Sequence, residues 1–233
     1  MTRLEDGGAV FRLEDEQGSA EKTCYHVFPG IYLIYNDIHM GLCIADLGKR
    51  QRKIEIDHCR EGRLECGVGQ NSFYLAPGDI SIHRRGEGLQ ENRFPSGHYR
   101  GITIQIDLDA SPQCLACFLE GVDVEPASID HKFHLGDIFS FALRQPPGIE
   151  HIFSELYEVP KSIQAGYFRV KILELLLFLS SLEPGEDQLE QRRVSETQAA
   201  LARQVCAYLT EHLEHHITLA ELAEHLLKIF LQN

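Results

Sequence analysis

The feature that most constrains this chain is a change in hydrophobic period near residue 112. Before that point, short runs of β-branched and aromatic residues alternate with polar ones; Ile102, Ile104 and Ile106 would face one side of a strand and Thr103 the other. After it, apolar residues recur every three or four positions, which is typical of amphipathic helices. This order predicts an α+β fold, with an antiparallel β-sandwich or small barrel followed by helices.

The β-rich half is punctuated by turn residues. The strand-like runs lie at 32–35, 40–47, 52–59, 64–68, 73–75, 80–83 and 101–106. Glu61-Gly62 predicts a hairpin turn because glycine accepts a positive φ, and Pro77-Gly78-Asp79 predicts a second turn.

Helices are predicted at 149–157, 162–182 and 194–212, with a short one beginning near Leu219. The helix at 162–182 carries two apolar stripes, so we expect it to be covered on two sides. One stripe, which we expect to face the β-domain, is Phe168, Ile172, Leu175, Leu179 and Leu182. The other, which we expect to face a partner helix in the same chain or in the second copy of a homodimer, is Ile163, Tyr167, Val170 and Leu177.

The polar stretch 183–193 is the best domain boundary. We therefore divide the chain into an N-terminal extension (1–19), a barrel (20–110), a helical dimerisation segment (111–185), a linker (186–193) and a second, all-α segment (194–233).

The net charge is −13, and both halves are acidic: residues 1–150 carry 15 basic and 23 acidic residues, and residues 151–233 carry 7 and 12. Neither half has the excess of lysine and arginine that a domain needs to bind nucleic-acid phosphates by itself. No apolar run is long enough to span a bilayer, and the start has no signal-peptide core, so we expect a cytoplasmic protein with no membrane partner. Seven scattered cysteines predict reduced thiols.

The most distinctive polar stretch follows Ile54 and Ile56. Alternation places His58 and Arg60 on the same face as these isoleucines and nearer the turn, which predicts that both lie at the mouth of the barrel. Their hydrogen-bond donors suit an anionic or hydroxyl-rich ligand. With Glu65 and His83 they form our candidate effector site.

A metal centre built from His58, Glu65 and His83 is the alternative, as in a metal-dependent enzyme. Its spacing is poor and Arg60 would repel a cation, so we expect no metal and no cofactor. The sequence has no nucleophile elbow, P-loop or dinucleotide motif, and we expect no catalytic residues.

Four segments together resemble the AraC/XylS family of transcriptional regulators. They are the strand pair His58-Cys59-Arg60-Glu61-Gly62-Arg63-Leu64-Glu65, then Tyr74-Leu75-Ala76-Pro77-Gly78-Asp79, the helix Arg169-Val170-Lys171-Ile172-Leu173-Glu174-Leu175-Leu176, and Ile217-Thr218-Leu219-Ala220-Glu221-Leu222-Ala223. Residues 20–185 resemble the family's cupin-like effector-binding and dimerisation domain. In the last segment Thr218 and Glu221 form a capping box, and Leu219, Leu222, Ala223 and Leu226 form the apolar face expected of the first helix of a helix-turn-helix.

The resemblance implies a ligand-responsive regulator of transcription that forms a homodimer, binds a small-molecule effector and has DNA as a partner. Only Leu226 to Asn233 follow that first helix, so we expect a truncated helix-turn-helix domain that lacks the base-reading helix. A ligand-binding and dimerisation module without DNA binding, which pairs with a full-length relative, is therefore an alternative. Sugars, small anions and metal chelates all fit a polar barrel mouth.

Overall fold

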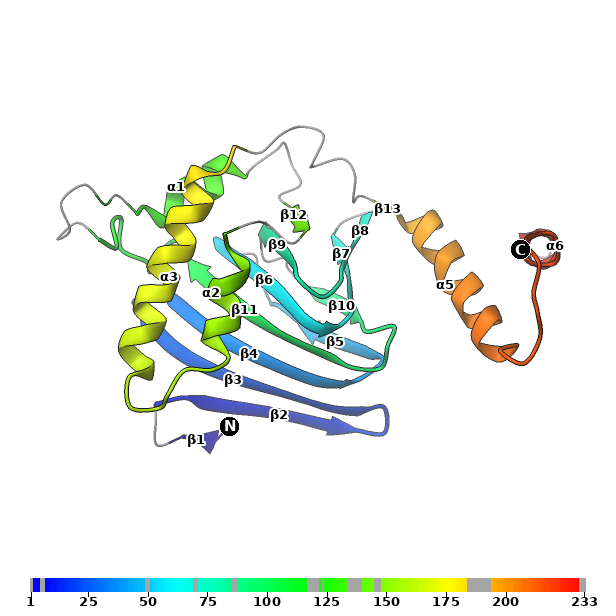
Figure 1. Ribbon diagram of the computed structural model, residues 1–233, viewed down its shortest axis with the longest axis horizontal. Helices are drawn as coiled ribbons and strands as arrows, with labels where there is room; N and C mark the ends of the chain where they lie inside the picture. The colour runs from blue at the N-terminus through cyan, green and yellow to red at the C-terminus, as the bar shows by residue number, and fades with distance from the viewer. Residues whose placement is uncertain are drawn as a thin grey trace.

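The computed structural model describes residues 2–4, 7–48, 51–68, 71–84, 88–116, 122, 124–133, 140–144, 148–183 and 194–230. Antiparallel sheets come first in the chain and helices follow, which confirms the predicted α+β fold class (Figure 1). Among these residues no helix is long and apolar enough to cross a bilayer.

The larger sheet has eight strands, all paired antiparallel. Its order is β1 (Thr2–Arg3), β2 (Ala9–Asp15), β3 (Gly18–Phe28), β4 (Ile31–Met40), β11 (Tyr99–Asp107), β6 (Lys53–Gly62), β9 (Asp79–Arg84) and β12 (Ser140–Arg144). The smaller sheet has the order β13 (Val194–Ser195), β8 (Asn71–Leu75), β7 (Leu64–Val68), β10 (Leu89–Arg93) and β5 (Leu42–Asp46). The larger sheet begins inside the predicted N-terminal extension, because β2 pairs with β3 along its whole length.

Three helices cover one face of the larger sheet (Figure 1): α1 (Pro126–Lys132), α2 (Glu150–Leu156) and α3 (Gln164–Ser181). The isoleucines of β6, β9 and β11 form the main hydrophobic core with them, and Ile54, Ile56 and Ile102 are fully buried there. The apolar face of the sheet therefore packs against helices. Its polar face lies toward the smaller sheet.

Two tight corners carry the chain from one sheet to the other. Glu61-Gly62 ends β6 in the larger sheet, and β7 begins at Leu64 in the smaller one, so the predicted hairpin is a corner between sheets. Gly62 has a φ of 78°, and a Cβ there would meet the backbone oxygen of His98. Pro77-Gly78-Asp79 forms the second corner, where the Asp79 side chain accepts a 2.9 Å hydrogen bond from the Ala76 amide.

Helix α3 confirms the predicted helix at 162–182 and separates its two stripes. Four residues of the first stripe are buried against the sheet: Phe168, Ile172, Leu175 and Leu179. In the second stripe Ile163, Val170 and Leu177 are exposed and Tyr167 is half-buried. One side of α3 is thus committed to the β-domain, and the other is open to solvent.

Two further helices follow, α5 (Glu196–Glu211) and α6 (Leu219–Phe230), and they extend away from the β-domain (Figure 1). The predicted capping box is confirmed: the Thr218 amide donates to Glu221 Oε2 at 2.8 Å, and the Glu221 amide donates to Thr218 Oγ1 at 3.3 Å. Leu219 is exposed and Leu222 half-buried on α6, while Ala223 is exposed; Leu226 lies further along the same helix.

Most of the described cysteines form no disulfide, namely Cys24, Cys43, Cys59, Cys66 and Cys206. Cys114 is disulfide-bonded, so the prediction of reduced thiols is wrong at that position.

Candidate functional site

A cavity of about 310 Å³ lies between the polar face of the larger sheet and the smaller sheet. Strands β3, β4, β6, β9 and β11 supply one wall, and β5, β7 and β10 supply the other. The exposed lining residues are Phe11 on β2, Lys22 on β3 and Asp46 at the end of β5, which places the open end of the cavity between these strands. This volume lies at the small end of the range typical of ligand pockets.

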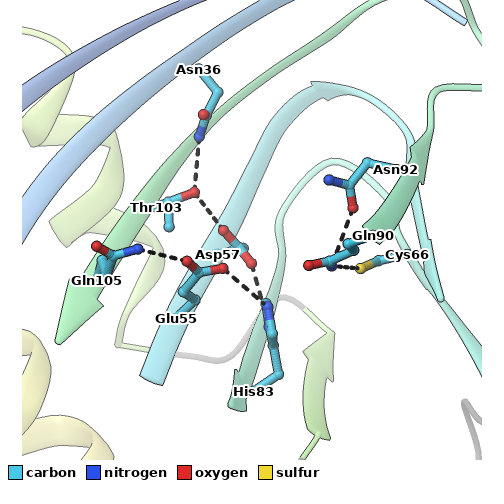
Figure 2. Close-up of polar contacts among 9 residues, drawn as sticks. All are labelled: Asn36, Glu55, Asp57, Cys66, His83, Gln90, Asn92, Thr103 and Gln105. Atoms are coloured by element: carbon cyan, nitrogen blue, oxygen red, sulfur yellow. Dashed lines mark hydrogen bonds and ion pairs between the residues drawn. The ribbon is translucent and has the colours of Figure 1, made fainter. Parts of the chain in front are cut away.

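The centre of the cavity wall is a buried cluster of two carboxylates and one imidazole. Glu55 and Asp57 come from alternate positions of β6, and His83 comes from the neighbouring strand β9 (Figure 2). His83 Nε2 lies 3.4 Å from Glu55 Oε2, and His83 Nδ1 lies 3.5 Å from Asp57 Oδ2. One ligand atom from each residue lies within 4.8 Å of the others, so the three groups converge on one point.

Neutral side chains on the adjacent strands hold the carboxylates in place (Figure 2). Thr103 Oγ1 donates a 2.5 Å hydrogen bond to Asp57 Oδ1 and accepts one of 2.9 Å from Asn36 Nδ2. Gln105 Nε2 donates at 2.7 Å to Glu55 Oε1. Each carboxylate thus has one oxygen fixed by a neutral donor while its other oxygen faces His83.

Burial and mutual charge shift the ionisation of the cluster. Burial raises the pKa of Asp57, and Glu55 raises it further, while His83 acts in the opposite direction. Burial alone would lower the pKa of His83, but the hydrogen bond to Glu55 and the charges of Asp57 and Glu55 outweigh it and raise that pKa. Both groups therefore hold protons more strongly than they would in water.

The opposite wall offers amides and a thiol. Gln90 Nε2 lies 2.7 Å from Cys66 Sγ and 3.5 Å from Asn92 Oδ1, and all three residues line the cavity (Figure 2). Burial raises the pKa of the Cys66 thiol to about 12, so it stays protonated at neutral pH. These three side chains can donate and accept hydrogen bonds but carry no charge.

The structure corrects the predicted placement of His58 and Arg60. The His58 ring stacks on Phe153 of α2 with centroids 4.3 Å apart, and the Arg60 guanidinium lies 4.2 Å above the ring of Tyr157, next to α2. Both follow Ile54 and Ile56, as predicted, but that face packs under the helices and does not line the cavity. Their role as effector ligands stays a prediction.

Glu65 also points away from the cavity. It lies on β7 between Leu64 and Cys66, which do line the cavity, and its buried carboxylate forms an ion pair with Arg203 of α5. Of the four predicted effector ligands, only His83 therefore reaches the cavity. The alternative metal set of His58, Glu65 and His83 is not brought together either, because these side chains point in three different directions.

Glu55 and Asp57 were not among the predicted site residues, although they alternate with Ile54 and Ile56 in the same strand. The sequence pattern did not indicate which face of β6 meets the second sheet. Two acidic residues and a threonine or glutamine in register on neighbouring strands could have indicated it, because carboxylates placed on a covered face need fixed donors.

No family model matches the sequence, and no curated protein matches it. Similar solved structures include the AraC-like transcriptional activator CuxR (9% identity, 89% of this chain and 70% of that one, TM-score 0.44). They also include an apo ToxT variant from Vibrio cholerae (9%, 84% and 70%, TM-score 0.43) and a cupin 2 conserved barrel domain protein from Rhodopseudomonas palustris (14%, 48% and 81%, TM-score 0.34). At these identities and TM-scores the likeness identifies neither a ligand nor an activity.

Proposed function

We propose that this chain is a ligand-responsive regulator of AraC type. In this proposal the cavity between the sheets binds a small-molecule effector, and the outer face of α3 forms a homodimer contact. Helices α5 and α6 carry the response toward DNA. The sequence motifs that resemble the AraC/XylS family support the assignment, and the observation that carries it is the path from the cavity to α5.

That path runs through three consecutive residues of β7. Leu64 and Cys66 line the cavity, and Glu65 between them contacts Arg203 of α5 on the other side of the strand. Because neighbouring side chains of a strand point to opposite faces, a ligand that shifts β7 would also move the carboxylate that holds α5. A ligand can act this way only if it binds more tightly to one arrangement of α5 than to another.

The charges of the cavity restrict the class of effector. Among the described lining residues, the carboxylates of Glu55, Asp57 and Asp46 outnumber the single lysine, Lys22. An anionic effector would be repelled by this excess of carboxylates. The cavity therefore favours cationic ligands, metal chelates or neutral ligands rich in hydroxyl groups, and the small anions left open by the sequence are disfavoured.

The test uses Cys206, an exposed thiol on α5, as a reporter. The chain is labelled there with an environment-sensitive dye, in a background where Cys43 is replaced by serine and Cys24, which lines the cavity, is retained because burial raises the pKa of its thiol. Cys59 and Cys66 are buried, and burial raises the pKa of both thiols to about 12, so they should not react. A panel of pentoses, hexoses, polyamines and amino acids is screened by thermal shift, and each stabilising compound is titrated against the dye.

We expect the stabilising compound to change the dye signal saturably, with the affinity found by thermal shift. In Arg203→Gln the compound should still raise the melting temperature, but the dye response should fall several-fold. A compound that saturates the cavity without any change at Cys206, or a panel in which nothing binds, would contradict the proposal. Conversion of the bound compound to a product, followed by NMR, would favour the enzyme alternative instead.

A further inference from the structure

We propose that Glu55, Asp57 and His83 form a binding site for one divalent transition-metal ion, such as Mn²⁺ or Zn²⁺. This inference deepens the proposed function and rests on it for its biological role, because it makes a metal ion, alone or with an organic chelator, the ligand of the cavity. The sequence led us to expect no metal; the set it offered as an alternative was His58, Glu65 and His83, and only His83 is common to both.

The spacing of the three groups leaves room for one shared ion, because one ligand atom from each residue lies within 4.8 Å of the other two and the contacts between them are long. The two nitrogen–oxygen distances of 3.4 and 3.5 Å exceed the usual N–H···O range of about 2.7–3.2 Å. Metal–ligand bonds of about 2.1 Å, arranged octahedrally or tetrahedrally, separate neighbouring ligand atoms by roughly 3.0–3.4 Å. An ion could therefore enter between His83 and either carboxylate with small side-chain movements.

The surroundings resemble the outer shell of a metal site. Metal-binding carboxylates are commonly held by a second hydrogen bond that fixes their orientation. Thr103, itself held by Asn36, fixes Asp57, and Gln105 fixes Glu55, each through the oxygen that faces away from His83. The other oxygen of each carboxylate points toward His83, where the three groups converge.

The charge of the cluster also favours a divalent cation. When His83 ligates an ion it does so as a neutral imidazole, so the two carboxylates supply two negative charges at a site where Asp57 and His83 are both buried. A divalent cation brings this set to zero net charge. Lys22, which also lines the cavity, is the only lysine or arginine among the described lining residues.

The donor types indicate the class of metal. One imidazole and two carboxylates suit Mn²⁺, Fe²⁺ and Zn²⁺, whereas Mg²⁺ and Ca²⁺ prefer all-oxygen sets. With three protein ligands on one side, the remaining positions would face the cavity, where water or a chelating small molecule could complete the coordination. This geometry accommodates the metal chelates that the sequence left open as effectors.

The test is an EPR titration of the tag-free full chain with Mn²⁺ after treatment with EDTA. Free Mn²⁺ gives a strong six-line signal, so the bound ion is counted by the signal that disappears. We expect one Mn²⁺ per chain, displaced by Zn²⁺. Spin-echo measurements on the bound ion should detect the nitrogen of one histidine, and this coupling should be lost in His83→Gln.

Variants separate this site from surface histidines. Glu55→Gln and Asp57→Asn should weaken Mn²⁺ binding at least tenfold, and Thr103→Val should weaken it by about 10- to 100-fold through the loss of the outer hydrogen bond. Asp15→Asn is the matched control, because Asp15 is exposed on β2 and is not among the described residues that line the cavity, and it should bind like the wild type.

Absence of saturable binding up to 1 mM Mn²⁺ or Zn²⁺ would overturn the metal site, and so would unchanged binding in both Glu55→Gln and Asp57→Asn. The wild-type stoichiometry and the nitrogen coupling need no destabilised variant, so they remain decisive if a replacement fails to fold. None of these measurements involves α5, so their failure would leave the dye experiment on Cys206 to judge the regulatory proposal separately.

Discussion

His58 shows how one residue can be placed in the correct strand and still face an unexpected neighbour. It alternates with Ile54 and Ile56 as the sequence predicts, but the face they share is covered by α2, so the imidazole is buried against Phe153. Burial lowers its pKa to about 4, with the nearby Arg60 charge acting in the same direction. His58 is therefore neutral in the folded protein at pH values where it would be protonated in the unfolded chain.

This shift predicts that the stability of the folded protein decreases as the pH is lowered through a window set by His58. Between its ordinary pKa of about 6.5 and the folded value of about 4, the unfolded chain binds a proton that the folded chain does not. The contribution of His58 is therefore complete above pH 7 and is lost progressively as the pH falls toward 4. We expect the shift at His58 to lower the unfolding free energy by about 2 kcal/mol as the pH is lowered from 7.5 to 5, measured by urea denaturation.

His58→Gln is the matched variant, because it keeps a polar side chain but cannot titrate. Its unfolding free energy should depend less on pH than that of the wild type, by about the same 2 kcal/mol over this interval. Equal pH dependence in the two proteins would show that His58 is not the group responsible.

At the scale of elements, strand β6 separates what could be predicted from what could not. Alternation correctly divided Ile54 and Ile56 from Glu55 and Asp57, because the period of a strand is fixed by its backbone. It did not say which face meets helices and which meets the second sheet. The isoleucine face was assigned to the barrel interior, whereas the interior is built on Glu55 and Asp57, and two polar residues were consequently missed.

The corner after β6 depends on Gly62, which leads to a prediction about stability. Its φ of 78° is unfavourable for any residue with a side chain, and a Cβ would also collide with the backbone oxygen of His98. Gly62→Ala should therefore lower the unfolding free energy by about 3 kcal/mol, as measured by chemical denaturation.

Gly97→Ala separates the two causes. Gly97 has a similar φ of 70°, but none of the described residues comes within 4 Å of the position that a Cβ would occupy there. The replacement should cost only about 1 kcal/mol, which is the effect of the backbone conformation alone. Similar losses for both variants would mean that the corner tolerates a methyl group and that the contact with His98 is unimportant.

At the scale of the whole molecule, strand pairing creates the candidate site. Glu55, His83 and Thr103 meet because β6 lies between β9 and β11, and this order joins strands that are far apart in the chain. Local patterns predict strands, turns and caps, including the capping box at Thr218, because these depend on neighbouring residues. Pairing order depends on the packing of the complete sheet, and no local pattern in this sequence specifies it.

The outer stripe of α3 leads to the last prediction, which concerns association between copies of the chain. Ile163 and Val170 are 52% and 60% exposed, a high exposure for two aliphatic residues on one side of a helix whose other side is buried in the core. Tyr167 donates a 2.5 Å hydrogen bond to Glu155 beside them, and Lys171 forms ion pairs with Glu155 and Glu174. An apolar centre with a charged rim is typical of a protein–protein interface.

We therefore expect a homodimer at concentrations on the order of 10 μM, measured by sedimentation velocity. Val170→Glu should convert it to a monomer, because a charge buried between two helices would have no partner. Ile44→Glu is the control: Ile44 is 54% exposed on β5, away from α3, and its replacement should leave the dimer intact. A monomeric wild type, or equal dissociation by both variants, would remove α3 as the contact and leave the communication between the cavity and α5 as a property of one chain.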